Sequence, residues 1–321
     1  MGHSVQVAGN TGCLYLMGNC IPYYEIRERE WILMDCGSRL ARTQLAEYLG
    51  KNKISVRAVL CSHGHYDHTE NNRFLQEEYG AELVMSCLDA GILQDTLSLK
   101  TVFYSNTLQD NERECSDMLC KADQMILPGQ EQVQVCGVQF RILSLPGHAA
   151  SHMGFVTPDG VAYLADSMFD RESLKKGRLF YMLCWSQTLK TLEKIKNLGY
   201  KKYILAHYGV FDEVRELAEE NIQRFKEILR DMKPLISEDI TLEQLTAKVI
   251  NDMGHPVKRL EKAKLYERIV RSMLEYLLEQ GDVSCYHRGS SRRWQVLRNI
   301  VFMRVTGIVG KCEKAENRVG N

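Results

Sequence analysis

Four potential metal ligands fall within six positions of this chain: His63, His65, Asp67 and His68. The mainly aliphatic residues 56–60 before them predict a buried strand, which places the ligands on the loop at its carboxyl end, where catalytic loops usually lie. His63 and His65 alternate in an extended segment and can point the same way, whereas Asp67 and His68 follow on a turn and can face a second point. One loop could therefore serve two metal ions.

The motif His-x-His-x-Asp-His after a strand resembles the signature of the metallo-β-lactamase-fold superfamily. Four further segments are similar to landmarks of that family and occur in the family's order, over about residues 5–210: Asp35-Cys36-Gly37, Pro146-Gly147-His148, Ala165-Asp166 and Ala206-His207. Ala165 stands where the family more usually has glycine. The resemblance implies an αββα sandwich of two sheets with helices outside.

The resemblance also implies a set of seven metal ligands. His63, His65 and His148 would bind one metal, Asp67, His68 and His207 the other, and Asp166 both. Asp67 would also receive a proton as the leaving group departs, while Asp35 and His152 would hold the ligands by hydrogen bonds.

The types of these side chains suit two divalent metal ions. Imidazole suits zinc or iron, and a carboxylate between two cations can hold them ~3.5–4 Å apart. We expect zinc, with iron or manganese as alternatives. A hydroxide shared by two such ions forms near neutral pH and attacks a carbonyl or phosphoryl centre. The ligand set therefore predicts a hydrolase.

Single histidines are more often packed or surface residues than ligands, and only the complete set favours a metal site. We interpret His3, His255 and His287 as ordinary packed or solvated residues. Asp166 occupies the place where antibiotic-degrading class B enzymes carry cysteine, which argues against β-lactamase activity. His65 occupies the place where the flavin-linked di-iron oxygen reductases carry glutamate, which argues against redox chemistry.

Composition is that of a globular enzyme with no strong global field. The chain has 321 residues, of which 45% are hydrophobic, and 41 basic residues balance 41 acidic ones. Its eleven cysteines are dispersed, odd in number and without a Cys-x-x-Cys motif, so we expect reduced thiols. The amino terminus has no signal-peptide pattern and no apolar run is long enough to cross a bilayer, so we expect a cytoplasmic protein.

Periodicity predicts an α+β fold for residues 1–233. The expected strands cover residues 13–17, 31–34, 56–61, 82–85, 133–145, 154–157, 161–165 and 203–206, and a helix is expected over residues 187–198. A helical insertion over about residues 88–124, with Phe103 and Tyr104, would cap the site or form an ordinary surface insertion. Tyr66, Tyr104 and Tyr208 are candidate substrate contacts.

The pattern changes after His207. Helices are expected over residues 211–231, 241–253 and 260–280, followed by a hairpin over residues 283–297. Residues 234–298 resemble a small winged-helix module, and residues 299–321 would form a frayed tail. Arg288, Arg292 and Arg293 would lie at the hairpin tip and could contact phosphates. Shaping of the substrate cleft or homodimer formation are the alternative roles of this module.

Two enzymatic functions and one non-enzymatic function remain open at this point. The favoured function is a dinuclear metal-dependent hydrolase of a small-molecule ester, thioester or lactone, similar to the glyoxalase II (hydroxyacylglutathione hydrolase) branch. The alternative is a metal-dependent phosphodiesterase or endoribonuclease that holds RNA through the basic wing. A sensor or partner module is the third, and the complete ligand set weakens it. No membrane partner is expected.

Overall fold

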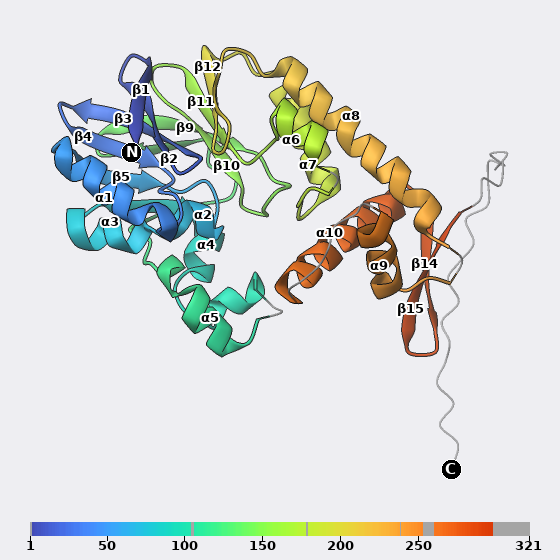
Figure 1. Cartoon of the computed structure of the whole chain (residues 1–321). Helices are drawn as coiled ribbons and strands as arrows, with labels where there is room; N and C mark the ends of the chain where they lie inside the picture. Colours follow the sequence, from blue (N-terminus) through green and yellow to red (C-terminus); the bar gives the residue numbers. More distant parts are fainter. Residues whose placement is uncertain (1, 104–105, 178, 238, 253–259, 298–321) are drawn as a thin grey trace.

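Two β-sheets lie face to face with helices on both outer sides, followed by a smaller helical unit (Figure 1). The structure is a computed structural model that describes residues 2–103, 106–177, 179–237, 239–252 and 260–297. Tyr104, His255 and the predicted tail fall outside the described residues. The αββα arrangement confirms the predicted α+β fold class.

The first sheet has seven strands in sequential order. They are β1 (His3–Ala8), β2 (Thr11–Leu16), β3 (Asn19–Arg27), β4 (Glu30–Met34), β5 (Ser55–Leu60), β6 (Glu82–Ser86) and β7 (Gln124–Ile126). Strands β1 to β4 pair antiparallel, whereas β4 to β7 pair parallel. The carboxyl ends of β4 and β5 therefore meet at one edge of the sheet.

The second sheet has six strands in the order β13-β12-β11-β10-β9-β8. Their bounds are β8 (Gln132–Val135), β9 (Val138–Ser144), β10 (Met153–Val156), β11 (Val161–Ala165), β12 (Lys202–Leu205) and β13 (Gly209–Phe211). Strands β11 and β12 pair parallel, so their carboxyl ends also lie together. The prediction of one strand over residues 133–145 was wrong, because Cys136 and Gly137 form a tight turn at φ values of 49° and 80°.

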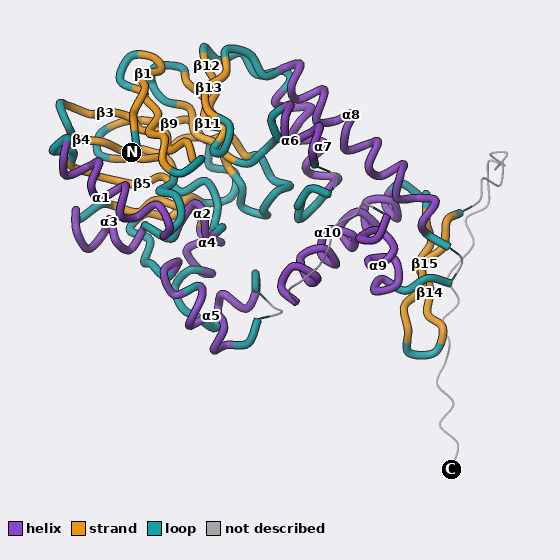
Figure 2. Tube along the Cα trace, viewed as in Figure 1, coloured by secondary structure: helices purple, strands orange, loops and turns teal. Residues whose placement is uncertain are grey.

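Helices cover the outer face of each sheet (Figure 2). Those packed on the first sheet are α1 (Arg42–Lys51) and α3 (Asn72–Tyr79), and those on the second are α6 (Arg171–Lys176), α7 (Trp185–Ile195) and α8 (Arg215–Met232). A third apolar cluster, with Ile32, Leu60, Phe140 and Phe155, fills the space between the sheets. Apolar side chains on both faces explain the nearly continuous apolar runs of the central strands.

Short helices surround the edge where the strands end. They are η1 (Arg39–Ala41), α2 (Tyr66–Thr69), α4 (Cys87–Ile92), η2 (Ser98–Thr101), α5 (Leu108–Glu114) and η3 (Ser116–Met118). The last four make up most of the predicted insertion. Among the described residues, no helix is both long and apolar enough to span a membrane.

The carboxy-terminal unit contains two helices and a hairpin. After η4 (Lys233–Leu235) come α9 (Leu242–Asp252), α10 (Leu260–Glu279), β14 (Val283–Arg288) and β15 (Ser291–Val296). One apolar cluster runs from Leu164 and Trp185 through Phe225 to Leu274 and Trp294. The domain boundary at residue 234 and the winged-helix assignment stay predictions, but the two units share this apolar core.

The three arginines of the hairpin do not form its tip. Arg288 lies in β14, Arg292 and Arg293 lie in β15, and the turn between the strands is Gly289-Ser290. Asp239 pairs with Arg288, and its carbonyl oxygen accepts from Arg293 Nη1 at 3.0 Å. Two of the three basic groups are therefore engaged within the protein.

The expectation that all cysteines are reduced was wrong for one pair. Cys13 on β2 and Cys20 on β3 form a disulfide, with their Cα atoms 6.1 Å apart. Cys20 lies opposite Tyr15, two residues from Cys13, so both cysteines face the same side of the antiparallel pair. Diagonal neighbours on one face can be bridged in this way, although no Cys-x-x-Cys motif signals it.

Candidate metal centre

The seven predicted ligands come together where the strands of both sheets end. The loop after β5 carries His63 and His65, the short helix α2 that follows carries Asp67 and His68, and the loop between β9 and β10 carries His148. Asp166 follows β11 directly, and His207 follows β12 after one residue. The parallel pairing of β4 with β5 and of β11 with β12 brings these ends together.

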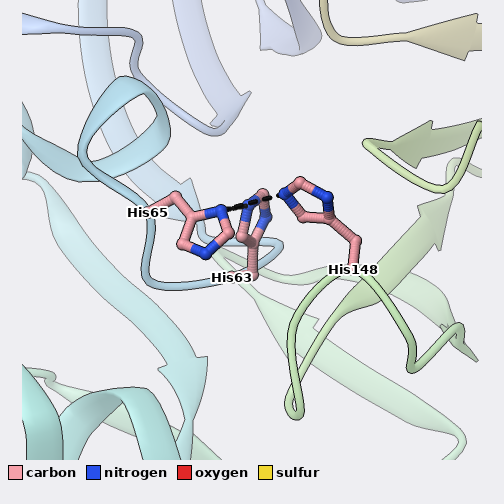
Figure 3. A group of neighbouring side chains, drawn as sticks. All are labelled: His63, His65 and His148. Carbon is pink, nitrogen blue, oxygen red and sulfur yellow. Dashed lines mark hydrogen bonds between the residues drawn. The ribbon is translucent and has the colours of Figure 1, made fainter. Parts of the chain in front are cut away.

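Three imidazoles form the first group of ligands (Figure 3). His65 Nδ1 lies 2.9 Å from His63 Nε2 and 2.9 Å from His148 Nε2. His63 is fully buried, and no carboxylate belongs to this group. Three ring nitrogens directed at a common point present lone pairs to a cation.

Two carboxylates and two imidazoles form the second group, Asp67, His68, Asp166 and His207. His207 Nε2 lies 3.4 Å from Asp67 Oδ2 and 3.4 Å from Asp166 Oδ1. Asp166 Oδ2 lies 3.4 Å from His68 Nε2 of the same group, and it also faces the first group, because it lies 3.5 Å from His148 Nε2. Asp166 thus lies between the two groups.

The two groups differ in charge. Burial lowers the pKa of His65 to about 4 and that of His148 to about 3, so both imidazoles are neutral at pH 7. Burial also acts on His207, but its interactions with Asp166 and Asp67 outweigh burial and raise its pKa to about 9. A cation entering the second group would therefore displace protons, whereas the first group is already deprotonated.

The described residues fit divalent cations. His68 Nε2 and Asp166 Oδ1 are buried without a hydrogen-bond partner, and both face the space between the ligands. Unpartnered buried polar atoms are costly, and a bound cation would satisfy them. Imidazole and carboxylate donors in this ratio suit zinc, iron or manganese.

Asp35 holds the segment that carries the candidate ligands through hydrogen bonds to Ser62 and His68. It is 2% exposed, and its two oxygens accept four hydrogen bonds. The donors are Ser62 N at 2.6 Å, Ser62 Oγ at 2.6 Å, His68 Nδ1 at 2.8 Å and Tyr163 Oη at 2.6 Å. The bond to Nδ1 leaves Nε2 of His68 available to a metal.

His152 lies behind Asp166. Its Nδ1 is 3.0 Å from the carbonyl oxygen of Leu145, and its Nε2 accepts from the backbone N of Asp166 at 3.1 Å. Both ring nitrogens are thereby engaged, and His152 stands in neither ligand group. This placement agrees with the supporting role expected for it.

Three supporting residues were missed from the sequence. Asn19 Oδ1 accepts from His207 Nδ1 at 2.9 Å, and Tyr163 donates to Asp35. The Tyr181 ring lies 5.7 Å from that of His65 and 5.6 Å from that of His148, centroid to centroid. All three reach the site from distant segments, and their types carry no metal-ligand signal, so only the fold reveals them.

The comparisons with known proteins agree with this geometry. The family model of the metallo-beta-lactamase superfamily matches residues 16–207. The chain belongs to the metallo-beta-lactamase superfamily. The predicted family and the prediction of a hydrolase of this superfamily are thereby confirmed.

Similar superfamily proteins include two curated relatives and one solved structure. The chain is 23% identical over 308 residues to "Atrochrysone carboxyl ACP thioesterase" of Aspergillus chevalieri, covering 92% of this chain and 87% of the relative. It is 22% identical over 234 residues to "Hydroxyacylglutathione hydrolase 1" of Vibrio vulnificus, covering 69% and 79%. A metallo-beta-lactamase family structure from Thermus thermophilus matches with a TM-score of 0.66 at 19% identity, covering 87% of this chain and 94% of that one.

The superfamily's Pro-Gly-His turn is held tightly here, which gives a test of how His148 is placed. Gly147 has φ +142°, and an added Cβ would lie 2.6 Å from the backbone N of Thr188 on α7. We expect Gly147→Ala to lower the free energy of unfolding by about 1–3 kcal/mol and to weaken metal binding, because the turn must move. Gly199→Ala is the matched control, since a Cβ there meets nothing within 4 Å. Equal unfolding midpoints for the two variants would contradict this placement.

Proposed function

We propose that the protein is a dinuclear metal-dependent hydrolase of small-molecule esters, thioesters or lactones, with thioesters preferred. His63, His65 and His148 would hold one cation, Asp67, His68 and His207 the other, and Asp166 both. The observation that carries this proposal is the position of Asp166 between the two groups, with Oδ2 within 3.5 Å of His148 Nε2 and within 3.4 Å of His68 Nε2.

The cations, most often zinc in such a ligand set, would polarise the substrate carbonyl and lower the pKa of a coordinated water towards ~7. Residues of the chain orient the ligands and transfer the proton. Asp35 and Asn19 fix the ring orientations of His68 and His207. Although burial acts to raise its pKa, the hydrogen bond with His207 lowers the pKa of Asp67 to about 2. Asp67 is thus ionised and able to accept a proton and pass it to the leaving group.

Two features support a thioester over an RNA substrate. Both curated relatives named above carry thioester-related names, a thioesterase and a hydroxyacylglutathione hydrolase. In addition, Arg288 and Arg293 of the hairpin contact Asp239, which reduces the positive charge that a phosphate backbone would meet.

Metal content and a substrate panel test the proposal. We expect two metal equivalents by elemental analysis of the wild type, about one or fewer for His148→Ala, and no change for His287→Ala, an exposed histidine on β14. The metal-loaded protein should hydrolyse S-lactoylglutathione or other thioesters, with little turnover of bis-p-nitrophenyl phosphate or single-stranded RNA. RNA turnover that disappears in Arg292→Ala/Arg293→Ala, with thioesters untouched, would overturn it in favour of the nuclease.

A further inference from the structure

A large cavity adjoins the Asp67 side of the metal centre. Its volume is about 1260 Å³, and Tyr66 and Asp67 of α2 line it together with residues of the β2–β3 turn and η1. Phe103 of the insertion and residues of α10 also line it. Because Asp67 belongs to the second ligand group, a molecule in this cavity would lie next to one of the candidate metal ligands.

Apolar side chains gather around this cavity although they face solvent. Leu40 is 75% exposed, Met17 59%, Tyr66 54% and Leu265 40%, and all four line the cavity. Single exposed apolar residues are common on proteins, but several around one concave surface mark a binding site for an apolar group.

The α10 wall of the cavity is basic. Lys262, Lys264 and Arg268 line it, and Lys264 and Arg268 are one helical turn apart. The acidic lining residues apart from Asp67 have partners: Glu70 accepts from the backbone N of Arg39, which also lines the cavity, at 2.8 Å, and Glu114 pairs with Arg113 at 2.8 Å. The cavity therefore combines apolar side chains near α2 with positive charge on α10.

We infer that the cavity takes a thioester with an apolar acyl group, bound against Met17, Leu40 and Tyr66, and an anionic thiol part, bound along α10. This inference rests on the proposed function and narrows its substrate class. The metal centre lies beside Asp67, where the two parts of such a substrate join.

The reaction is a hydrolysis that needs no co-reactant besides water. The water oxygen bonds to the acyl carbon, the carbon–sulfur bond breaks, and the sulfur keeps that electron pair. One water proton passes by way of Asp67 to the sulfur, which leaves as the thiol, and the acyl product leaves as a carboxylic acid that ionises in solution. The apolar acyl group then remains against the cavity wall until the product departs.

Substrates that differ in acyl-chain length test whether the apolar wall binds the acyl group. We expect kcat/KM for octanoyl-coenzyme A to exceed that for acetyl-coenzyme A by about 10-fold or more in the metal-loaded protein, since methylenes in a hydrophobic site each add selectivity. Leu40→Ser and Met17→Ser should reduce that ratio several-fold, mainly through KM. Leu127→Ser and Met125→Ser are matched controls, because these side chains are 60% and 56% exposed and lie outside the cavity.

Substrates that differ in the charge of their thiol part test whether the basic α10 wall binds an anion. Lys262→Glu should raise KM for octanoyl-coenzyme A and S-octanoylglutathione and leave that for neutral S-octanoyl-N-acetylcysteamine unchanged. The larger of the two KM increases shows whether phosphate or carboxylate is the preferred anion, and unchanged KM for both would overturn the assignment of the α10 wall. Lys226→Glu on α8 is the control, since Lys226 is exposed and does not line the cavity.

Binding separates this inference from the proposed function. The thioether S-octyl-coenzyme A cannot be hydrolysed, and calorimetry should show that it binds more tightly than S-methyl-coenzyme A, with weaker binding in Leu40→Ser. Selective thioether binding without turnover of any thioester would refute the proposed function and keep the cavity assignment. Equal binding of both thioethers, or equal effects of Leu40→Ser and Leu127→Ser, would overturn the inference.

Discussion

Asp166→Asn is expected to lower kcat/KM by about 10³-fold or more and to leave about one metal equivalent or fewer. Asp166 has atoms within 3.5 Å of His68, His148 and His207, and removal of its charge affects both ligand groups at once. A residue that only supports a ligand is worth about 10–100-fold in metal affinity or activity, and a ligand shared by two cations is worth more. Elemental analysis and steady-state kinetics on one thioester measure both effects.

The control for Asp166→Asn is Asp212→Asn. Asp212 has a side chain 82% exposed and pairs with Lys202 on β12, close in the sequence to His207 but outside both ligand groups. It should keep two metal equivalents and full activity. An Asp166→Asn protein with wild-type metal content and kinetics would show that the carboxylate does not join the cations, and the two-metal proposal would fail.

Asp35→Ala is expected to lower the free energy of unfolding by about 3–5 kcal/mol even without metal. The change leaves Ser62, His68 and Tyr163 without their shared acceptor in a buried site. Burial opposes the protonation of His68, but Asp166 and Asp35 outweigh burial and raise its pKa well above the usual range, so a buried charge loses one of its two partners. Urea unfolding with a chelator present separates this effect from metal binding.

Tyr163→Phe serves as the graded comparison for Asp35→Ala. It removes a single donor to Asp35 and should cost about 1–2 kcal/mol. In the double variant the two losses should not add, because both act on one hydrogen-bond network. Additive losses, or an Asp35→Ala protein as stable as the wild type, would mean that Asp35 does not hold the loop.

The central strands of the fold could be predicted because both of their faces are buried. The runs around residues 31–34 and 161–165 are apolar throughout and that around 56–60 is apolar except for Arg57, and they became β4, β11 and β5. Strand β1 was not predicted because most of its side chains are half or fully exposed, and β3 because Pro22 interrupts its pattern. The amphipathic helix expected at residues 187–198 was found as Trp185–Ile195.

The clustering of the seven candidate ligands could be predicted because four of them lie within six positions of the sequence and the others follow recognisable strands. The hydrogen bonds that support these ligands could not be predicted from the sequence. Tyr163 meets Asp35 across 128 positions of the chain, and Asn19 meets His207 across 188. No sequence pattern around these two residues predicts a hydrogen bond to a partner so far away in the chain. The basic hairpin was misjudged for the same reason, because Asp239 lies 49 residues before Arg288.

Arg268 connects the carboxy-terminal unit to the part of the protein that carries the candidate metal ligands. Its guanidinium lies 5.6 Å from the centre of the Tyr181 ring, which itself lies against His65 and His148, and its Nη1 donates to the carbonyl oxygen of Val102 at 2.9 Å. With Phe225, Met232 and Leu274 in one apolar cluster, a gene truncated after codon 233 would encode a protein lacking part of its own interior. Residues 1–233 alone would therefore leave part of this apolar cluster exposed to solvent.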